Sequence, residues 1–220
     1  MINYSVNEEI HLQIADITVT GDLAIPVDAK GLVVFAHGTG SSRHSARNKF
    51  VASKLQEHNY ATLLFDLLTV QEDRDYTNRF DIEMLTKRLL DVTDRLKQDP
   101  RTADLSIGYF GASTGAAAAL KAAAQLGGIV QAVVSRGGRP ELAGAALHQV
   151  RTPTLLLVGS LGKAAIELDE QAYVLLRVEK ELRIIEGASH LFEEAGKLEE
   201  VSEISAEWFD KFLITVRNSE

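Results

Sequence analysis

Short, continuous apolar runs recur along the chain, and amphipathic segments separate them. Such runs are typical of strands that are buried on both faces of a parallel sheet. The predicted strands are Leu32–Ala36, Ala61–Leu68, Leu105–Phe110, Val130–Val134, Thr154–Val158 and Leu182–Ile185. The helices predicted between and after them are Ser45–His58, a segment around Ile82–Leu96, Thr114–Leu126, Pro140–His148, Ala165–Leu176 and a closing helix with apolar positions from Val201 to Val216.

Repeated alternation of strand and helix predicts an α/β fold, in which a mostly parallel sheet carries helices on both faces. Two further extended segments, Ile10–Ile14 and Ile17–Ile25, precede this pattern. No linker, repeat or low-complexity segment interrupts it, so we expect one domain over residues 1–220. The segment Arg136–Arg151 has room for little more than one short helix, and we therefore expect no large lid domain.

Charge and composition narrow the class of function. The net charge of −8 argues against binding to nucleic acid, whose phosphates would repel the chain. The absence of cysteine excludes disulfides, thiolate metal sites and a cysteine nucleophile. The N-terminus has no apolar signal segment, and no apolar run is long enough to cross a bilayer. We expect a cytoplasmic protein that acts on a small molecule without a membrane, a cofactor or a metal ion.

The strongest chemical motif is Gly111-Ala112-Ser113-Thr114-Gly115, which matches G-x-S-x-G. It lies directly between a predicted strand and an alanine-rich predicted helix, which is the context that this motif requires. In such a turn the serine is held above the sheet, and the glycines avoid clashes with neighbouring elements. The helix start also offers free N–H groups to a developing oxyanion. Ser113 is therefore the predicted nucleophile.

A second loop, His37-Gly38-Thr39-Gly40, follows the first buried strand. Its glycines allow backbone N–H groups to turn toward a bound substrate. We expect the N–H groups of Thr39 and Thr114 to form the oxyanion hole.

His190 follows the last predicted strand and is the last histidine in the chain. Hydrolases with this turn place serine, acid and histidine in that order, so His190 is the predicted general base. The acid is expected in the loop after Thr154–Val158, but residues 159–165 contain no carboxylate. Glu141, Glu167 and Asp169 remain candidates, and no acid is assigned.

Together these residues resemble the dienelactone hydrolase family of α/β-hydrolases from about residue 20 to 213. The likeness also includes Arg79-Phe80-Asp81, Ser135-Arg136-Gly137-Gly138-Arg139-Pro140 and His190-Leu191-Phe192-Glu193-Glu194. It extends to hydrolase domains that some bacterial proteins carry fused to a phosphoribosyltransferase-like domain. The resemblance implies an α/β-hydrolase fold. It also implies cysteine where this chain has Ser113, and aspartate where this chain has Gly162.

Two functions remain open after these observations. The first is a serine esterase that cleaves small soluble esters or lactones. The second is a degenerate hydrolase that binds a ligand or partner without turnover, which the glycine at position 162 favours. Arginines near the catalytic end of the sheet, Arg43, Arg136 and Arg139, are candidate contacts for an anionic substrate. The alternative is that they pair with the chain's own acids and brace the loops.

Overall fold

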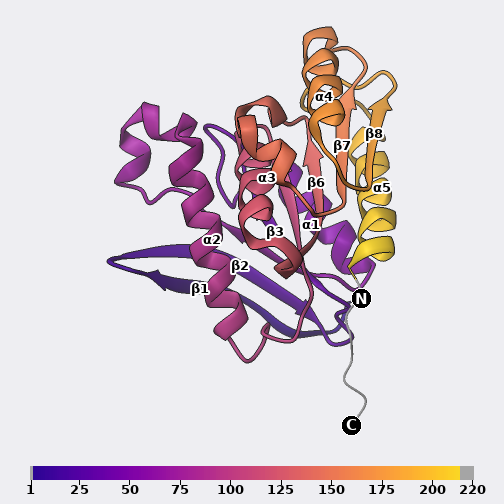
Figure 1. The fold of residues 1–220 in the computed structure, drawn as a ribbon. Coiled ribbons are helices and arrows are strands. Elements are labelled where there is room, and N and C mark those ends of the chain that lie inside the picture. The colour runs from indigo at the N-terminus through magenta and orange to yellow at the C-terminus, as the bar shows by residue number, and fades with distance from the viewer. Residues whose placement is uncertain (1, 214–220) are drawn as a thin grey trace.

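The computed structural model describes residues 2–213, and its centre is an eight-stranded sheet in the order β1-β2-β4-β3-β5-β6-β7-β8 (Figure 1). The pairs β1–β2 and β2–β4 are antiparallel, and every other pair is parallel. The strands span Tyr4–Ile14 (β1), Ile17–Pro26 (β2), Leu32–Ala36 (β3), Ala61–Phe65 (β4), Ile107–Ala112 (β5), Val130–Arg136 (β6), Thr154–Gly159 (β7) and Lys180–Ile185 (β8).

Helices cover both faces of this sheet, which confirms the predicted α/β-hydrolase architecture (Figure 1). One face packs against α2, α3, α4 and the 3-10 segment η4, and the other packs against α1 and α5. The α-helices are Ala46–Glu57 (α1), Ile82–Gln98 (α2), Thr114–Leu126 (α3), Lys163–Leu175 (α4) and Lys197–Phe212 (α5). The 3-10 segments are Glu72–Arg74 (η1), Tyr76–Phe80 (η2), Gly127–Ile129 (η3) and Pro140–Gln149 (η4).

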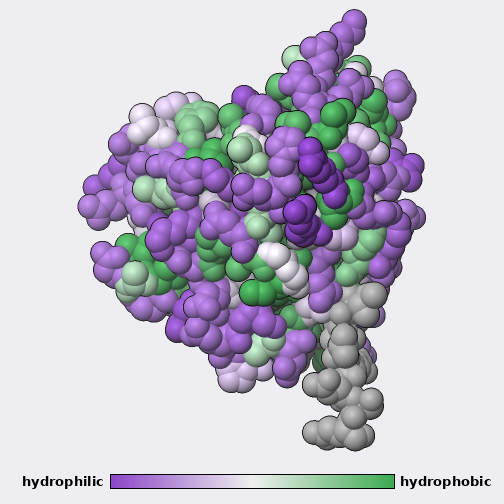
Figure 2. Space-filling view, viewed as in Figure 1, coloured by the Kyte–Doolittle hydropathy of each residue, from purple (hydrophilic) through white to green (hydrophobic). Residues whose placement is uncertain are grey.

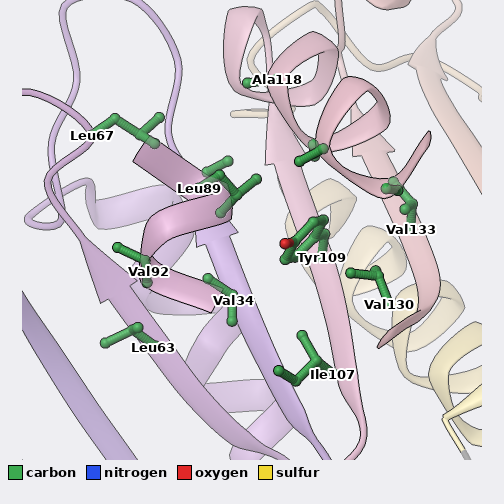
Figure 3. Packing of buried hydrophobic residues seen from close by; sticks show 14 of the residues in the cluster. Val34, Leu63, Leu67, Leu89, Val92, Ile107, Tyr109, Ala118, Val130 and Val133 are labelled. Carbon is green, nitrogen blue, oxygen red and sulfur yellow. The ribbon is translucent and has the colours of Figure 1, made fainter. Parts of the chain in front are cut away.

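Two apolar clusters hold the helices to the sheet, and β3 contributes to both. Successive side chains of a strand point to opposite faces. Val34 accordingly lies in the cluster beneath α2 and α3, whereas Val33 and Phe35 lie in the cluster beneath α1 and α5. Figure 3 shows the first cluster, where Leu89 and Val92 of α2 lie close to Val34 and Leu63 of the sheet.

Helix α3, which follows the nucleophile turn, is built largely of alanine. Alanine has the highest helix propensity, and its small side chain lets a helix lie close to a sheet. The side chains from Ala116 to Ala119 are fully buried. This part of the helix therefore lies close against the parallel strands.

The structure differs from the predicted elements in several places. β4 ends at Phe65, short of the predicted Leu68, because the chain turns out of the sheet there and the Leu67 N–H donates to His37 instead. The helix predicted at Pro140–His148 is a 3-10 segment with a kink at Gly144, whose φ is 57°. The turns η1 and η2 were not predicted. Val216, the last apolar position of the predicted closing helix, lies outside the described residues.

No large lid lies between β6 and β7, since η4 is the only helical segment described between them. On the face shown in Figure 2, hydrophilic residues predominate and hydrophobic residues form small, separate groups. Among residues 2–213 no helix is both long enough and apolar enough to span a membrane.

Candidate active site

Ser113 occupies a strained turn between β5 and α3. Its φ of 50° and ψ of −123° lie where a residue with a side chain is rarely found. A Cβ atom at Gly115 would lie 2.1 Å from the carbonyl oxygen of Ala36, and one at Gly111 would lie 2.4 Å from Cα of Ala116. Only glycine fits at either position, so the spacing of the motif follows directly from the closeness of strand and helix.

The loop after β3 lies directly against this turn. A Cβ atom at Gly38 would lie 2.8 Å from Cβ of Ser113. The Thr39 and Thr114 hydroxyl oxygens are 3.0 Å apart, and Thr39 Oγ1 also donates to the carbonyl oxygen of Arg79 at 3.3 Å. Because Thr39 has one hydroxyl proton, Thr114 is the donor between the two threonines. These bonds hold the loop beside the first turn of α3, whose N–H groups have no partner within the helix.

The His37 ring stabilises this loop through two polar contacts. Its Nε2 accepts a hydrogen bond from the Leu67 N–H at 3.0 Å, and its Nδ1 lies 3.1 Å from the carbonyl oxygen of Gly38. Burial lowers the pKa of His37, which favours the neutral ring. A neutral ring with Nδ1 protonated satisfies both contacts. His37 therefore has a structural role in the loop.

His190 lies in the loop after β8, and it lines the same cavity as Ser113. The cavity has a volume of about 120 Å³. Among residues 2–213 no hydrogen bond joins Ser113 to His190, and no carboxylate forms a hydrogen bond or ion pair with the His190 ring. The loop itself is fastened by Glu194, which accepts a hydrogen bond from the Ser189 N–H at 3.0 Å. The residues that line the cavity are Gly38, Thr39, Ser41, Ser45, Arg47, Asn48, Ala112, Ser113, Arg136, Gly137, His190 and Leu191.

Arg136, at the end of β6, is a buried cation that lines this cavity. The residue is only 5% exposed, and its Nη2 donates to Asn48 Oδ1 at 3.1 Å. Its guanidinium carbon lies 5.9 Å from the centre of the Phe192 ring. Nε has no hydrogen-bond partner, and no carboxylate pairs with the group among the described residues. Burial, with a smaller contribution from Arg47, lowers its pKa to about 10, so it remains charged at neutral pH.

The other two arginines predicted to contact substrate are paired with the chain's own acids. Arg43 forms ion pairs with Glu9, Asp22 and Asp66. Arg139 pairs with Glu141. Neither lines the cavity that contains Ser113 and His190. Arg47 does line the cavity, although it also pairs with Glu193.

The electrostatic environment of His190 is cationic. Burial lowers the pKa of His190, and Arg136, Arg139 and Arg47 lower it further by repulsion of the protonated ring. The imidazole is therefore neutral at pH 7 and available as a base. The same field opposes the imidazolium that forms once it has taken a proton.

The model of the dienelactone hydrolase family matches residues 19–214. The chain belongs to the dienelactone hydrolase family. The crystal structure of a dienelactone hydrolase from Anabaena variabilis superposes with a TM-score of 0.92 at 48% identity, over 94% of this chain and 98% of that one. The esterase Est1E from Butyrivibrio proteoclasticus shares the fold, with a TM-score of 0.75 at 17% identity over 92% of this chain and 98% of its own.

A longer protein of Mycobacterium tuberculosis is also similar. It carries the name "putative phosphoribosyl transferase" and is 51% identical over 203 residues. Those residues make up 92% of this chain but 46% of the relative, so the chain spans about half the length of that protein.

Gly162, where the resemblance to the family predicts the acid, has room around it. It is the N-cap residue of α4, and a Cβ atom there would meet only Ala165 Cβ at 3.5 Å and the Gly159 carbonyl at 3.7 Å. None of the other candidates contacts His190. Glu141 pairs with Arg139, Glu167 is exposed, and Asp169 is fully buried on α4.

Asn48 is a cavity residue that the sequence analysis did not identify. It lies on the buried side of α1 with Val51 and Leu55, and it accepts the hydrogen bond from Arg136. A polar residue at i, with apolar residues at i+3 and i+7, is a recognisable signal, because it places an amide among core side chains.

Proposed function

We propose that this chain is a serine hydrolase that cleaves small soluble esters or lactones. The observation that carries the proposal is the backbone of Ser113, which is held at a positive φ at the start of α3 and in the same cavity as His190. Strain of this kind persists only where the surrounding structure enforces it, and it is concentrated at functional sites.

The proposed reaction has two steps. Ser113 Oγ attacks the ester carbonyl carbon while His190 takes the hydroxyl proton, and the N–H groups of Thr39 and Thr114 stabilise the oxyanion. The C–O bond to the alcohol then breaks, and the alcohol leaves with the proton from His190. Water hydrolyses the acyl-enzyme by the same route and restores Ser113.

Arg136 supports a preference for substrates that carry a carboxylate. A buried charge with no opposite charge beside it is costly, and a bound anion would offset that cost. The cavity is small, and no large lid lies between β6 and β7 to form a long apolar tunnel. We therefore propose small anionic esters or lactones as the favoured class.

A matched pair of substrates tests this proposal. The mono-p-nitrophenyl ester of succinic acid and p-nitrophenyl butanoate have acyl chains of equal length, and only the first carries a carboxylate. We expect a higher kcat/KM for the succinate, loss of both activities in Ser113→Ala, and a higher KM for the succinate alone in Arg136→Ala. Equal kcat/KM values for the two esters would exclude the anion preference.

The second candidate function is binding of an ester-like ligand without turnover. The absence of a carboxylate contact to His190 among residues 2–213 favours it. Saturable binding of the succinate ester without release of p-nitrophenol would support this alternative and exclude the first.

A further inference from the structure

The cavity contains a second polar feature beside the catalytic pair, at the start of α1. Ser41, Ser45, Arg47 and Asn48 line the cavity together with Ser113 and His190. Ser45 caps the helix, because its hydroxyl accepts a hydrogen bond from the Asn48 N–H at 3.3 Å. The first N–H groups of a helix have no partner within it, and the positive end of the helix dipole lies there. The start of α1 therefore favours a negatively charged ligand.

Arg136 adds an independent observation that points to the same ligand. It lines the same cavity and is only 5% exposed. Asn48 connects the two features, since its amide oxygen accepts from Arg136 Nη2 while its residue belongs to the first turn of α1. The Nε of Arg136 is buried and has no hydrogen-bond partner, so the hydrogen bonds of the guanidinium are not all satisfied within the described residues. A small oxyanion could accept from this arginine and from α1 together.

The charges around His190 show what such an anion would do. Three cations repel the protonated ring through their charge: Arg136 at the end of β6, Arg139 in the loop after β6, and Arg47 on α1. Arg139 and Arg47 have carboxylate partners, Glu141 and Glu193. Glu194, on the histidine's own loop, is bonded to the Ser189 N–H. Arg136 is thus the cation near His190 whose charge no described carboxylate balances.

We propose that an oxyanion held between Arg136 and the start of α1 supplies the negative charge that stabilises protonated His190 during turnover, in place of a carboxylate at position 162. The anion is the carboxylate of the substrate itself, or a separate small oxyanion that accompanies a neutral substrate. This inference rests on the proposed function. It adds that the site is electrostatically complete only when an anion is bound.

The expected effect on His190 follows from simple electrostatics. An opposite charge within about 4–6 Å raises the pKa of a cationic acid by about 1–3 units. The bound anion would also cancel the repulsion from Arg136. His190 would then hold the proton from Ser113 more firmly, and proton transfer would become easier.

NMR titration of His190 in Ser113→Ala tests the inference without any need for turnover. The ring resonances are followed against pH with 10 mM sodium sulfate and without it, at one ionic strength set with sodium chloride. Sulfate is the probe because its charge is constant over the titration range. We expect sulfate to raise the His190 midpoint by about one pH unit. An unchanged midpoint would overturn the inference.

Variants assign the effect to the proposed position. Arg136→Met and Arg47→Ala should each reduce the sulfate-induced shift, whereas Arg139→Met should retain it, because Arg139 is paired outside the cavity. Arg47 is partly exposed, so its replacement tests the site even if Arg136→Met fails to fold. A shift that persists in both Arg136→Met and Arg47→Ala would contradict the proposed location.

Failure of the inference and failure of the proposed function give different results. If the serine hydrolase proposal is wrong, an active-site serine reagent does not modify Ser113, whatever His190 does with sulfate. If only the present inference is wrong, Ser113 is modified, and the midpoint of the His190 titration is the same with and without sulfate.

Discussion

The hydroxyl oxygens of Thr39 and Thr114 lie 3.0 Å apart, and this contact joins the loop after β3 to the first turn of α3. It sets the positions of the two N–H groups that are proposed to form the oxyanion hole. Donors of this kind act through their fixed positions, because they do not need to reorganise as charge develops.

Removal of the Thr39 hydroxyl should therefore lower kcat, because the loop and the first turn of α3 would no longer be joined by this hydrogen bond. A net hydrogen bond contributes about 1 kcal/mol, so we expect Thr39→Val to reduce kcat by about fivefold in a steady-state ester assay. Thr18→Val is the matched control, because its exposed hydroxyl bonds to Gln13 on the β1–β2 hairpin. An equal loss in both variants would argue against a positioning role for Thr39.

The glycines of the nucleophile turn make a prediction about stability. A Cβ atom at Gly115 would lie 2.1 Å from a carbonyl oxygen, whereas one at Gly128 would have nothing within 4 Å. Gly115→Ala should lower the free energy of unfolding by about 1–3 kcal/mol or more, and Gly128→Ala should change it by less than about 1 kcal/mol. Urea denaturation measures both. A mild effect at Gly115 would mean that the strand and the helix are not as close as described.

Gly162, where the family resemblance predicts the acid, gives a third prediction. Gly162→Asp should raise kcat for neutral esters, because a carboxylate there would orient the imidazole and stabilise its cation. The side chain has room, and aspartate is also a favoured residue at the N-cap of a helix, which is the position of Gly162.

Gly162→Asn is the control for this variant, because it caps the helix without adding charge. A rise in kcat with aspartate but not with asparagine would identify the charge as the cause. No rise with aspartate would mean that a carboxylate at position 162 does not interact with the His190 ring.

Asp169 predicts a pH dependence of stability. The residue is fully buried, and neither carboxylate oxygen has a hydrogen-bond partner among the described residues. Burial, together with the nearby Glu141, raises its pKa to about 7. The folded protein therefore binds a proton at Asp169 that the unfolded chain releases at about pH 4. The contribution of Asp169 to the free energy of unfolding therefore falls as the pH rises from about 4 to about 7.

Asp169→Asn should remove that slope. We expect the variant to be more stable than the wild type at pH 8, with a difference that shrinks toward pH 5, as measured by urea denaturation at each pH. Glu170→Gln, on the exposed side of the same helix, should leave the slope unchanged. A wild-type slope that survives in Asp169→Asn would assign the pH dependence to another group.

Much of the fold was predictable because each buried strand and amphipathic helix carries a local signal. Leu32–Ala36 was predicted with the bounds of β3, and Thr114–Leu126 with those of α3. The turns η1 and η2 had no such signal, because their exposed residues form no apolar period. The end of β4 also depended on a distant contact, the bond from the Leu67 N–H to His37.

Of the site, the turn at Ser113 was predictable from the sequence, whereas the roles of the arginines were not. The turn at Ser113 has a local signature, since its glycines and the adjoining elements follow one another in sequence. The roles of Arg43 and Arg136 could not be separated, because an arginine's role depends on whether carboxylates from distant segments reach it. Glu9 and Asp22 reach Arg43 from the β1–β2 hairpin, and no described carboxylate reaches Arg136.

The central claim is that Ser113 is an activated nucleophile. Fluorophosphonates modify only serines whose hydroxyl is activated, so intact-mass spectrometry after treatment with such a probe tests the claim most directly. We predict one added probe mass on the wild-type chain, mapped to the peptide that contains Ser113, and none on Ser113→Ala. An unmodified wild-type chain, or equal modification of both chains, would contradict the account.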